Sequence, residues 1–441
     1  MEEKMRNAIR KALESGAMKY AIYPFGVQAR IFKWILNNEF GIEEALIIDN
    51  GKCEESGIKR FEQIEPSFWR DCVVFLVSDH SEIFFQLRSQ ALRYVPCDHI
   101  LDVLLNEWVS GDAMQKIFEG EGKVKVFFNP LSRQFQDRTV ETLGNNTGNI
   151  VYVESMREQL GYDIEAQLTT EWMREKLGRK NVISIMPASN FVAEYAVWCE
   201  NLIPILEDTD IQFTFAGLGA QAAFDETPKD VIAKLTHRQK YFFKLVSEHA
   251  EQIGVRGEFT AECLNVMGIR NVEIIGCPSF FQYKDKYPLL ASPTAGKILY
   301  TADNSKKDIH ALAGSEGTVI SQTHEDGQKK KEIIFYDFKQ WNDFIDKSKF
   351  TFAFGSRFHG NMMALRNGIP TLWIAHDWRT LELAQYLGLP YILYKECFKK
   401  VKSVEELFEF CDYSQVYKRY PSLNRTYCEF IRRNFDENFR K

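Results

Sequence analysis

The chain has 441 residues, of which 45% are apolar, and a formal net charge of −6. This length exceeds what one hydrophobic core usually holds, so two or three domains are expected. The composition excludes a disordered chain, and the negative charge argues against a nucleic-acid binder that relies on phosphate contacts. The nine cysteines form no C-x-x-C pair, which disfavours structural zinc and a disulfide framework. Because no apolar run has membrane-spanning length and the amino terminus lacks a signal-peptide core, we expect a cytoplasmic protein.

Short β-rich runs at residues 20–23, 45–48 and 72–77 open the chain, with an amphipathic helix between the first two. Strands that alternate with helices indicate a parallel sheet. We therefore predict a small Rossmann-like N-terminal domain over residues 1–108, whose ligand the sequence does not name.

The loop after the first strand is an incomplete dinucleotide-binding motif. That motif needs G-x-G-x-x-G and an acidic residue about twenty positions later. Here only Gly26 remains, Ala29 stands at the third glycine position, and Asp49 occupies the acidic position. The missing second glycine is the one that lets a pyrophosphate approach. We therefore favour the interpretation that Asp49 caps a turn over the alternative of a ribose contact.

Residues 109–138 are polar and helical, then extended over residues 124–128, and we interpret them as a packed connection between domains. From residue 139 the alternation of strands and helices begins again. We predict that residues 139–291 form the first lobe of a pair of Rossmann-type lobes. Its expected strands are residues 182–186, 211–215, 253–256 and 272–275.

Loops rich in asparagine and glycine accompany these strands. The loop at residues 144–149 reads G-N-N-T-G-N. Its asparagines either cap helices and turns or hold the hydroxyl groups of a substrate, and the sequence favours neither alternative. The candidate substrate-binding residues of this lobe are Asn146, Asn149, Asn190 and Gly217.

Arg256 ends the strand expected at residues 253–256, after three apolar positions. A cation at this place either reaches back to water along the sheet edge or serves a ligand. We favour a ligand, because open α/β sheets bind ligands at the carboxyl ends of their strands.

A second lobe is predicted over residues 292–401, and the charged loop at residues 324–331 is expected to be a solvated turn. Its most informative run is Ser356-Arg357-Phe358-His359-Gly360, at the switch from a buried strand into a short helix. A helix amino terminus favours anions there, and an arginine adds bidentate grip on a carboxylate or phosphate. The expected strands are residues 297–300, 318–321, 332–335, 350–354 and 371–375. The candidate substrate-binding residues are Ser356, Gly360, Asp377 and Arg379.

Residues 402–441 are predicted to be helical and are locally basic. We favour a helix that packs across both lobes with a solvated face. The alternative is attraction to an anionic membrane surface, which would place the protein at the inner face of the cell membrane.

Residues 144–390 resemble the polysaccharide pyruvyl transferase family. The resemblance rests on the G-N-N-T-G-N loop, on V-R-G-E-F-T around Arg256, on G-C-P-S at residues 276–279, and on S-R-F-H-G with the following G-I-P. It implies a fold like that of the two-lobed GT-B glycosyltransferases. It also implies that phosphoenolpyruvate donates a pyruvyl group, which forms a ketal with two hydroxyls of a sugar. In one departure, Asn149 stands where the family commonly has an aspartate.

Carried over by position, Arg256, Arg357 and His359 are the expected catalytic residues. The arginines would neutralise the donor's carboxylate and phosphate, and His359 would move a proton near neutral pH. We expect no metal and no cofactor besides phosphoenolpyruvate as donor substrate. The expected partner is a saccharide acceptor, with lipid-linked forms among the candidates, and no nucleic acid. Two alternatives remain open, a GT-B glycosyltransferase that uses a nucleotide-sugar and a binding module without catalysis.

Overall fold

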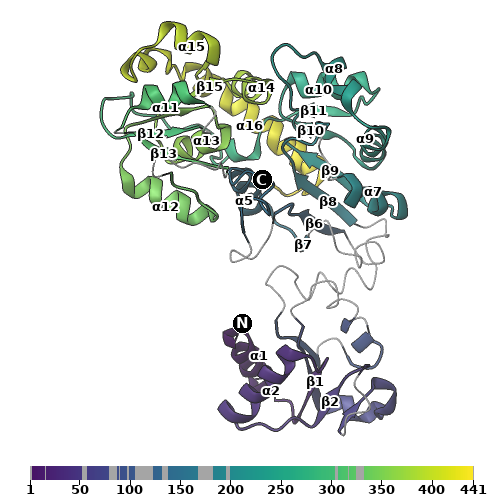
Figure 1. Ribbon diagram of the computed structural model, residues 1–441. Helices are drawn as coiled ribbons and strands as arrows, with labels where there is room; N and C mark the ends of the chain where they lie inside the picture. Colours follow the sequence, from purple (N-terminus) through teal and green to yellow (C-terminus); the bar gives the residue numbers. More distant parts are fainter. Residues whose placement is uncertain are drawn as a thin grey trace. The chain divides into compact units, whose positions relative to one another are not determined.

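The computed structural model in Figure 1 divides the chain into two compact units. One holds the described residues of Met1–Met114, and the other holds those of Gln115–Thr169 and Leu177–Lys441. The expected turn at residues 324–331 and most of the expected connection lie outside the described residues. None of the described helices is long and apolar enough to cross a membrane. The structure describes residues 2–14, 16–51, 57–78, 87–88, 90–96, 99–104, 123–131, 138–166, 182–194, 199–302, 306–315, 317–323 and 332–440.

The first unit contains a five-stranded parallel sheet in the order β3-β2-β1-β4-β5. Apolar residues of both helices and of the central strands pack into one core. This strand order is the Rossmann order, so the predicted Rossmann-like domain is confirmed. Its elements are α1 (Glu2–Glu14), β1 (Lys19–Tyr23), α2 (Val27–Glu39), β2 (Leu46–Ile48), β3 (Ile58–Lys59), η1 (Phe61–Gln63), η2 (Pro66–Asp71), β4 (Cys72–Leu76) and β5 (Ile100–Asp102).

The Asp49 carboxylate holds together the two loops that follow β1 and β2. Its Oδ1 accepts a hydrogen bond from the Gly51 backbone N–H at 2.8 Å, and its Oδ2 accepts one from the Phe25 N–H at 2.9 Å. The bond to Gly51 is the local turn cap that the favoured interpretation predicts, whereas the bond to Phe25 joins a second loop.

The first lobe of the second unit is built on a parallel sheet in the order β7-β6-β8-β9. The β10-β11 pair extends this sheet through a bridge between Leu218 and Val255. Its elements are β6 (Val124–Phe128), α5 (Asn149–Gln159), β7 (Ile164–Ala166), β8 (Val182–Pro187), α7 (Cys199–Asp208), β9 (Gln212–Ala216), α8 (Pro228–Lys234), α9 (His237–His249), β10 (Ile253–Val255), α10 (Glu258–Val266), β11 (Val272–Ile274) and η5 (Pro278–Phe280).

Strand β6 lies in the segment that we expected to be a connection. It pairs with β7 on one side and β8 on the other, so the sheet of the first lobe begins before residue 139. The sequence did indicate an extended run at residues 124–128. Its lysine, Lys125, and the Asn129-Pro130 break that follows made the run resemble a connection and not a strand of the sheet.

The second lobe contains a parallel sheet in the order β13-β12-β14-β15-β16. The strand expected at residues 332–335 is reduced to one bridge between Ile320 and Ile333. The elements are β12 (Ile298–Thr301), α11 (Lys307–Ala313), β13 (Thr318–Ile320), α12 (Phe338–Ser348), β14 (Phe352–Gly355), α13 (Phe358–Arg366), β15 (Thr371–Ala375), α14 (Trp378–Leu387), β16 (Tyr391–Leu393), α15 (Tyr394–Lys400) and η6 (Glu405–Phe410).

The last helix, α16 (Ser414–Asn434), packs against both lobes, as the favoured interpretation predicts (Figure 1). Toward the second lobe, Arg419 donates to the carbonyl of Gln385 at 2.7 Å. Toward the first lobe, the buried ring of Tyr427 stacks on Phe281 at 4.5 Å, and its hydroxyl donates to Gln159 at 2.9 Å. The helix therefore ties the two lobes together through apolar packing and hydrogen bonds.

We expect Tyr427→Ala to lower the free energy of unfolding by about 3–5 kcal/mol, because it empties a buried aromatic site at the junction of the lobes. Tyr427→Phe should cost only about 1 kcal/mol, the value of one hydrogen bond. Urea denaturation measures both changes. The control is Tyr241→Ala at an exposed position of α9, and an equal loss there would contradict the assignment.

Candidate functional site

The carboxyl ends of strands from both lobes surround one small pocket of about 40 Å³. The strands within each lobe's sheet are parallel, so the loops that follow them gather at one edge of that sheet, where open α/β folds bind ligands. Seven of the residues predicted from the sequence line this pocket. They are Asn146, Asn190 and Arg256 from the first lobe, and Ser356, Arg357, His359 and Arg379 from the second.

Arg256 does not reach back to water, because it is only 2% exposed. Its Nε donates to the carbonyl of Gly217 at 3.1 Å, and the guanidinium lies over the ring of Tyr152 at 5.9 Å. Gly219 leaves the space for this side chain, since a Cβ there would lie 2.8 Å from Cδ of Arg256. Among the described residues, nothing accepts a hydrogen bond from the terminal nitrogen Nη2. A buried cation with an unpaired donor is therefore available to an anionic ligand.

His359 lies in the first turn of α13 and is 5% exposed. Its Nε2 is 3.5 Å from Sγ of Cys277, and its ring contacts Tyr152 with centroids 5.0 Å apart. Burial lowers the pKa of His359 well below its ordinary value, and the nearby charges of Arg256 and Arg379 lower this pKa further. The imidazole is therefore neutral at pH 7 in the protein without ligand, which the sequence alone did not predict.

The turn from β14 into α13 places Ser356 and Arg357 at the pocket. Gly355 has a φ of +149°, and its lack of a Cβ lets the backbone lie against the carbonyl of Thr301. Arg357 is the N-cap of α13, and its Nη2 donates to Oγ1 of Thr323 at 3.4 Å. Ser356 is 1% exposed, and its Oγ has no hydrogen-bond partner among the described residues.

Four predicted residues lie near this pocket without lining it. Asn149 begins α5, and its side chain donates to the carbonyl of Leu143 in the preceding loop at 2.8 Å. The carbonyl of Gly217 holds Arg256, and Gly360 packs within α13. Asp377 is the N-cap of α14 and forms an ion pair with Arg379 at 2.6 Å.

A larger pocket of about 430 Å³ adjoins the first one, and His376 and Arg379 line both. Its wall carries both hydrogen-bond donors and hydrogen-bond acceptors. They include Gln221, the Glu226–Lys234 ion pair and Asp377. Paired charges and amides of this kind match the hydroxyl groups of a polar ligand. Among the described residues, no three His, Cys, Asp or Glu side chains gather as a metal site would require.

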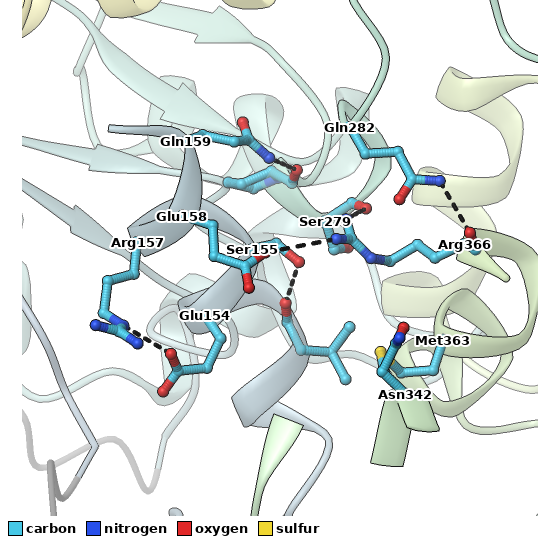
Figure 2. Close-up of polar contacts among 12 residues, drawn as sticks. Glu154, Ser155, Arg157, Glu158, Gln159, Ser279, Gln282, Asn342, Met363 and Arg366 are labelled. Carbon is cyan, nitrogen blue, oxygen red and sulfur yellow. Dashed lines mark hydrogen bonds and ion pairs between the residues drawn. The ribbon is translucent and has the colours of Figure 1, made fainter. Parts of the chain in front are cut away.

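The turn at Pro278 and Ser279, which directly follows Cys277, is held by Gln159 and Arg366. Figure 2 shows the side chains of Gln159, Ser279 and Arg366. Gln159 of α5 donates to the carbonyl of Pro278 at 3.0 Å. Arg366, at the end of α13, donates to the carbonyl of Ser279 at 2.9 Å and lies 3.9 Å from Glu158. These contacts fix the position of the Cys277 thiol, and hence of its contact with His359.

Sequence reasoning missed Glu382, a carboxyl group of α14 that is 3% exposed. It accepts hydrogen bonds from the backbone N–H of Thr260 at 3.0 Å and from its hydroxyl at 2.7 Å. Burial raises its pKa to about 7, although these bonds and Arg256 oppose the shift. Gln322, which lines the small pocket, was missed as well. Its place just after β13, at the same sheet edge as Ser356, was the signal that could have found it.

Comparison with known proteins confirms the family resemblance over part of the chain. Residues 233–377, about a third of the chain, match the model of the polysaccharide pyruvyl transferase family. This stretch contains Arg256, Arg357 and His359, whereas Asn146 and Arg379 lie outside it. No curated protein matches the sequence.

Several solved structures are similar to this chain, at low sequence identity and low TM-scores. A functionally uncharacterized protein of Klebsiella pneumoniae is 12% identical with a TM-score of 0.36, over 62% of this chain and 92% of its own. The S. aureus protein MnaA, solved with UDP, is 11% identical with a TM-score of 0.34, over 94% of this chain and 96% of its own.

We expect Glu382→Gln to change how stability depends on pH. The raised pKa means that the folded protein holds this proton more tightly than the unfolded chain. Its contribution to stability is therefore complete below pH 4.5, the ordinary pKa, and is lost as the pH rises to about 7. The melting temperature of Glu382→Gln relative to the unaltered protein should thus be higher at pH 8 than at pH 5. The lost acceptor for Thr260 adds an offset that does not vary with pH, so an equal difference at both pH values would contradict the assignment.

Proposed function

We propose that the protein transfers the pyruvyl group of phosphoenolpyruvate to two hydroxyls of a saccharide in a polysaccharide precursor, forming a ketal. One observation carries the proposal. Arg256 is buried, and its terminal nitrogen Nη2 has no hydrogen-bond partner among the described residues. It lines the same pocket as Arg357 and His359. The family match over residues 233–377 supports the same reaction class.

Charge is the first requirement of this donor, which carries a carboxylate and a phosphate. The two arginines offer planar forks that suit both groups. Their charges would also stabilise the negative charge that grows on the phosphate as it leaves. Because Arg256 is buried, its interaction with that charge is screened less than it would be in water.

Proton transfer is the second requirement. Because His359 is neutral, it can first accept a proton and then donate it. A neutral imidazole takes the proton of the first attacking hydroxyl and, as imidazolium, gives it to C3 of the enol. The hydroxyl oxygen bonds to C2, the C–O bond to phosphate breaks, and the second hydroxyl then bonds to C2. The proton of the second hydroxyl leaves with inorganic phosphate, so the products are the ketal and phosphate. Bound anion next to Arg256 offsets the field that lowers the pKa of His359, which favours the imidazolium.

Space is the third requirement. The small pocket suits the compact donor only after modest opening, whereas the adjoining pocket of about 430 Å³ has room for a saccharide. His376 and Arg379 line both pockets, so a sugar in the larger one would present its hydroxyls beside the donor. The acceptor in this proposal is nucleotide-linked or lipid-linked, as precursors of polysaccharides are.

We expect His359→Ala to lower the rate of phosphate release from phosphoenolpyruvate by roughly 10²–10⁴-fold, the usual contribution of a general acid–base group. The assay supplies a panel of nucleotide-linked and lipid-linked saccharides. The control, His237→Ala, alters an exposed histidine of α9 and should leave the rate unchanged. Undiminished turnover would refute the proposal. Thermal stabilisation by a nucleoside diphosphate but not by phosphoenolpyruvate would favour a nucleotide-sugar glycosyltransferase instead.

We expect Lys234→Met to raise the KM for the saccharide by roughly threefold to tenfold, because it removes one hydrogen-bonding group and unpairs Glu226 in the larger pocket. The KM for phosphoenolpyruvate should stay constant. Lys244→Met, which removes an exposed lysine paired with Glu248, is the matched control. A rise in the KM for phosphoenolpyruvate alone would place the saccharide elsewhere.

A further inference from the structure

Gln322 is a buried amide in the small pocket whose role no motif predicts. It follows β13 and is 1% exposed. Its backbone carbonyl accepts a hydrogen bond from the N–H of Thr147 at 2.9 Å, across the junction of the two lobes. The backbone of Gln322 is thus fixed while its side chain lines the pocket.

Two glycines, one from each lobe, make room for this side chain. A Cβ at Gly148 would overlap Oε1 of Gln322 and lie 2.8 Å from its Cδ. A Cβ at Gly360 would overlap Nε2 of the same amide. Gly148 has a φ of −60° and Gly360 lies within α13, so neither glycine is required by its backbone conformation. Their shared effect is to leave space for the Gln322 amide.

The Gln322 amide is held in place, but its hydrogen-bonding capacity is not fully used. Nε2 of Gln322 has no hydrogen-bond partner among the described residues, although less than a tenth of the side chain is exposed. The same holds for Nη2 of Arg256 and Oγ of Ser356, which line the same pocket. Leaving a buried donor unpaired destabilises a protein, so three of them around one space indicate a ligand that accepts hydrogen bonds. The nearby arginines make that ligand an anion.

We propose that Gln322 is a binding residue for the anionic donor, and that its Nε2 donates a hydrogen bond to an oxygen of the bound phosphate or carboxylate. This inference rests on the proposed function, since phosphoenolpyruvate is the anion in question. Gly148 and Gly360 then serve the ligand indirectly, by holding the amide at the pocket.

Gln322→Met tests the proposal, because methionine keeps the length of the side chain but cannot donate a hydrogen bond. Calorimetric titration should show a Kd for phosphoenolpyruvate raised roughly tenfold to a hundredfold, the loss of one hydrogen bond to a charged group. In the absence of ligand, the melting temperature should rise by roughly 2 °C, because an unpaired buried donor is removed.

Gln239→Met is the matched control. Gln239 is also buried, but its Nε2 donates to the carbonyls of Ala193 and Glu194, both at 3.2 Å. Its replacement should lower the melting temperature and leave the Kd for phosphoenolpyruvate unchanged. The two glutamines thus give opposite shifts in stability, which a purely structural role for Gln322 would not produce.

A double-mutant cycle tests whether Gly148 leaves the space that the Gln322 amide occupies. Gly148→Ala should weaken phosphoenolpyruvate binding in the unaltered protein, because the new methyl group displaces Gln322. In the Gln322→Ala background, the same change should cost nothing further. Gly26→Ala is the control, since no atom lies within 4 Å of a Cβ built there. If the two substitutions weakened phosphoenolpyruvate binding additively, Gly148 would not act through Gln322.

The outcomes separate this inference from the function on which it rests. If the unaltered protein binds phosphoenolpyruvate and Gln322→Met binds it equally well, the role of Gln322 is overturned and the pyruvyl transferase proposal stands. If the unaltered protein does not bind phosphoenolpyruvate at all, both proposals fall.

Discussion

A guanidinium group buried between two lobes is the constraint on which the rest of this site depends. Removing the charge of Arg256 from water is unfavourable unless other groups compensate for the lost hydration. The structure offers the Gly217 carbonyl, the face of Tyr152 and the nearby carboxyl group of Glu382, and these satisfy the side chain only in part. The deficit is a source of affinity for an anion, because a ligand that pairs with the free nitrogen removes an existing penalty.

The same buried charge determines the states of its neighbours. It adds to burial in lowering the pKa of His359, so the imidazole begins the proposed reaction without a proton. It opposes burial at Glu382, whose pKa nevertheless rises to about 7. The pKa values of these two groups therefore shift in opposite directions, because the same low-dielectric surroundings disfavour the charged form of each group.

Such a site requires that the two lobes keep their relative position. Two sets of contacts hold them together. Helix α16 packs on both lobes through its aromatic side chains and Arg419. In addition, Arg366 and Gln159 hold the turn that follows Cys277. The thiol therefore meets His359 in a fixed geometry, and the Gln322 backbone is fixed through Thr147. Part of this framework lies outside the stretch that matches the family model, since α5 precedes it and α16 follows it.

The sequence by itself determined which segments are strands and where their carboxyl ends lie, because buried strands are short apolar runs with turn residues after them. That was enough to bring Arg256, Arg357 and His359 to one edge in the prediction, since parallel strands end together. It was not enough to show that the extended run at residues 124–128 is a strand of the first lobe, or that the Asn149 side chain donates to the carbonyl of Leu143. Tertiary structure alone decided the protonation of His359, the pKa of Glu382 and the seating of Gln322 between Gly148 and Gly360. Each of these depends on burial and on contacts between residues far apart in the chain, and the local pattern of a sequence carries neither.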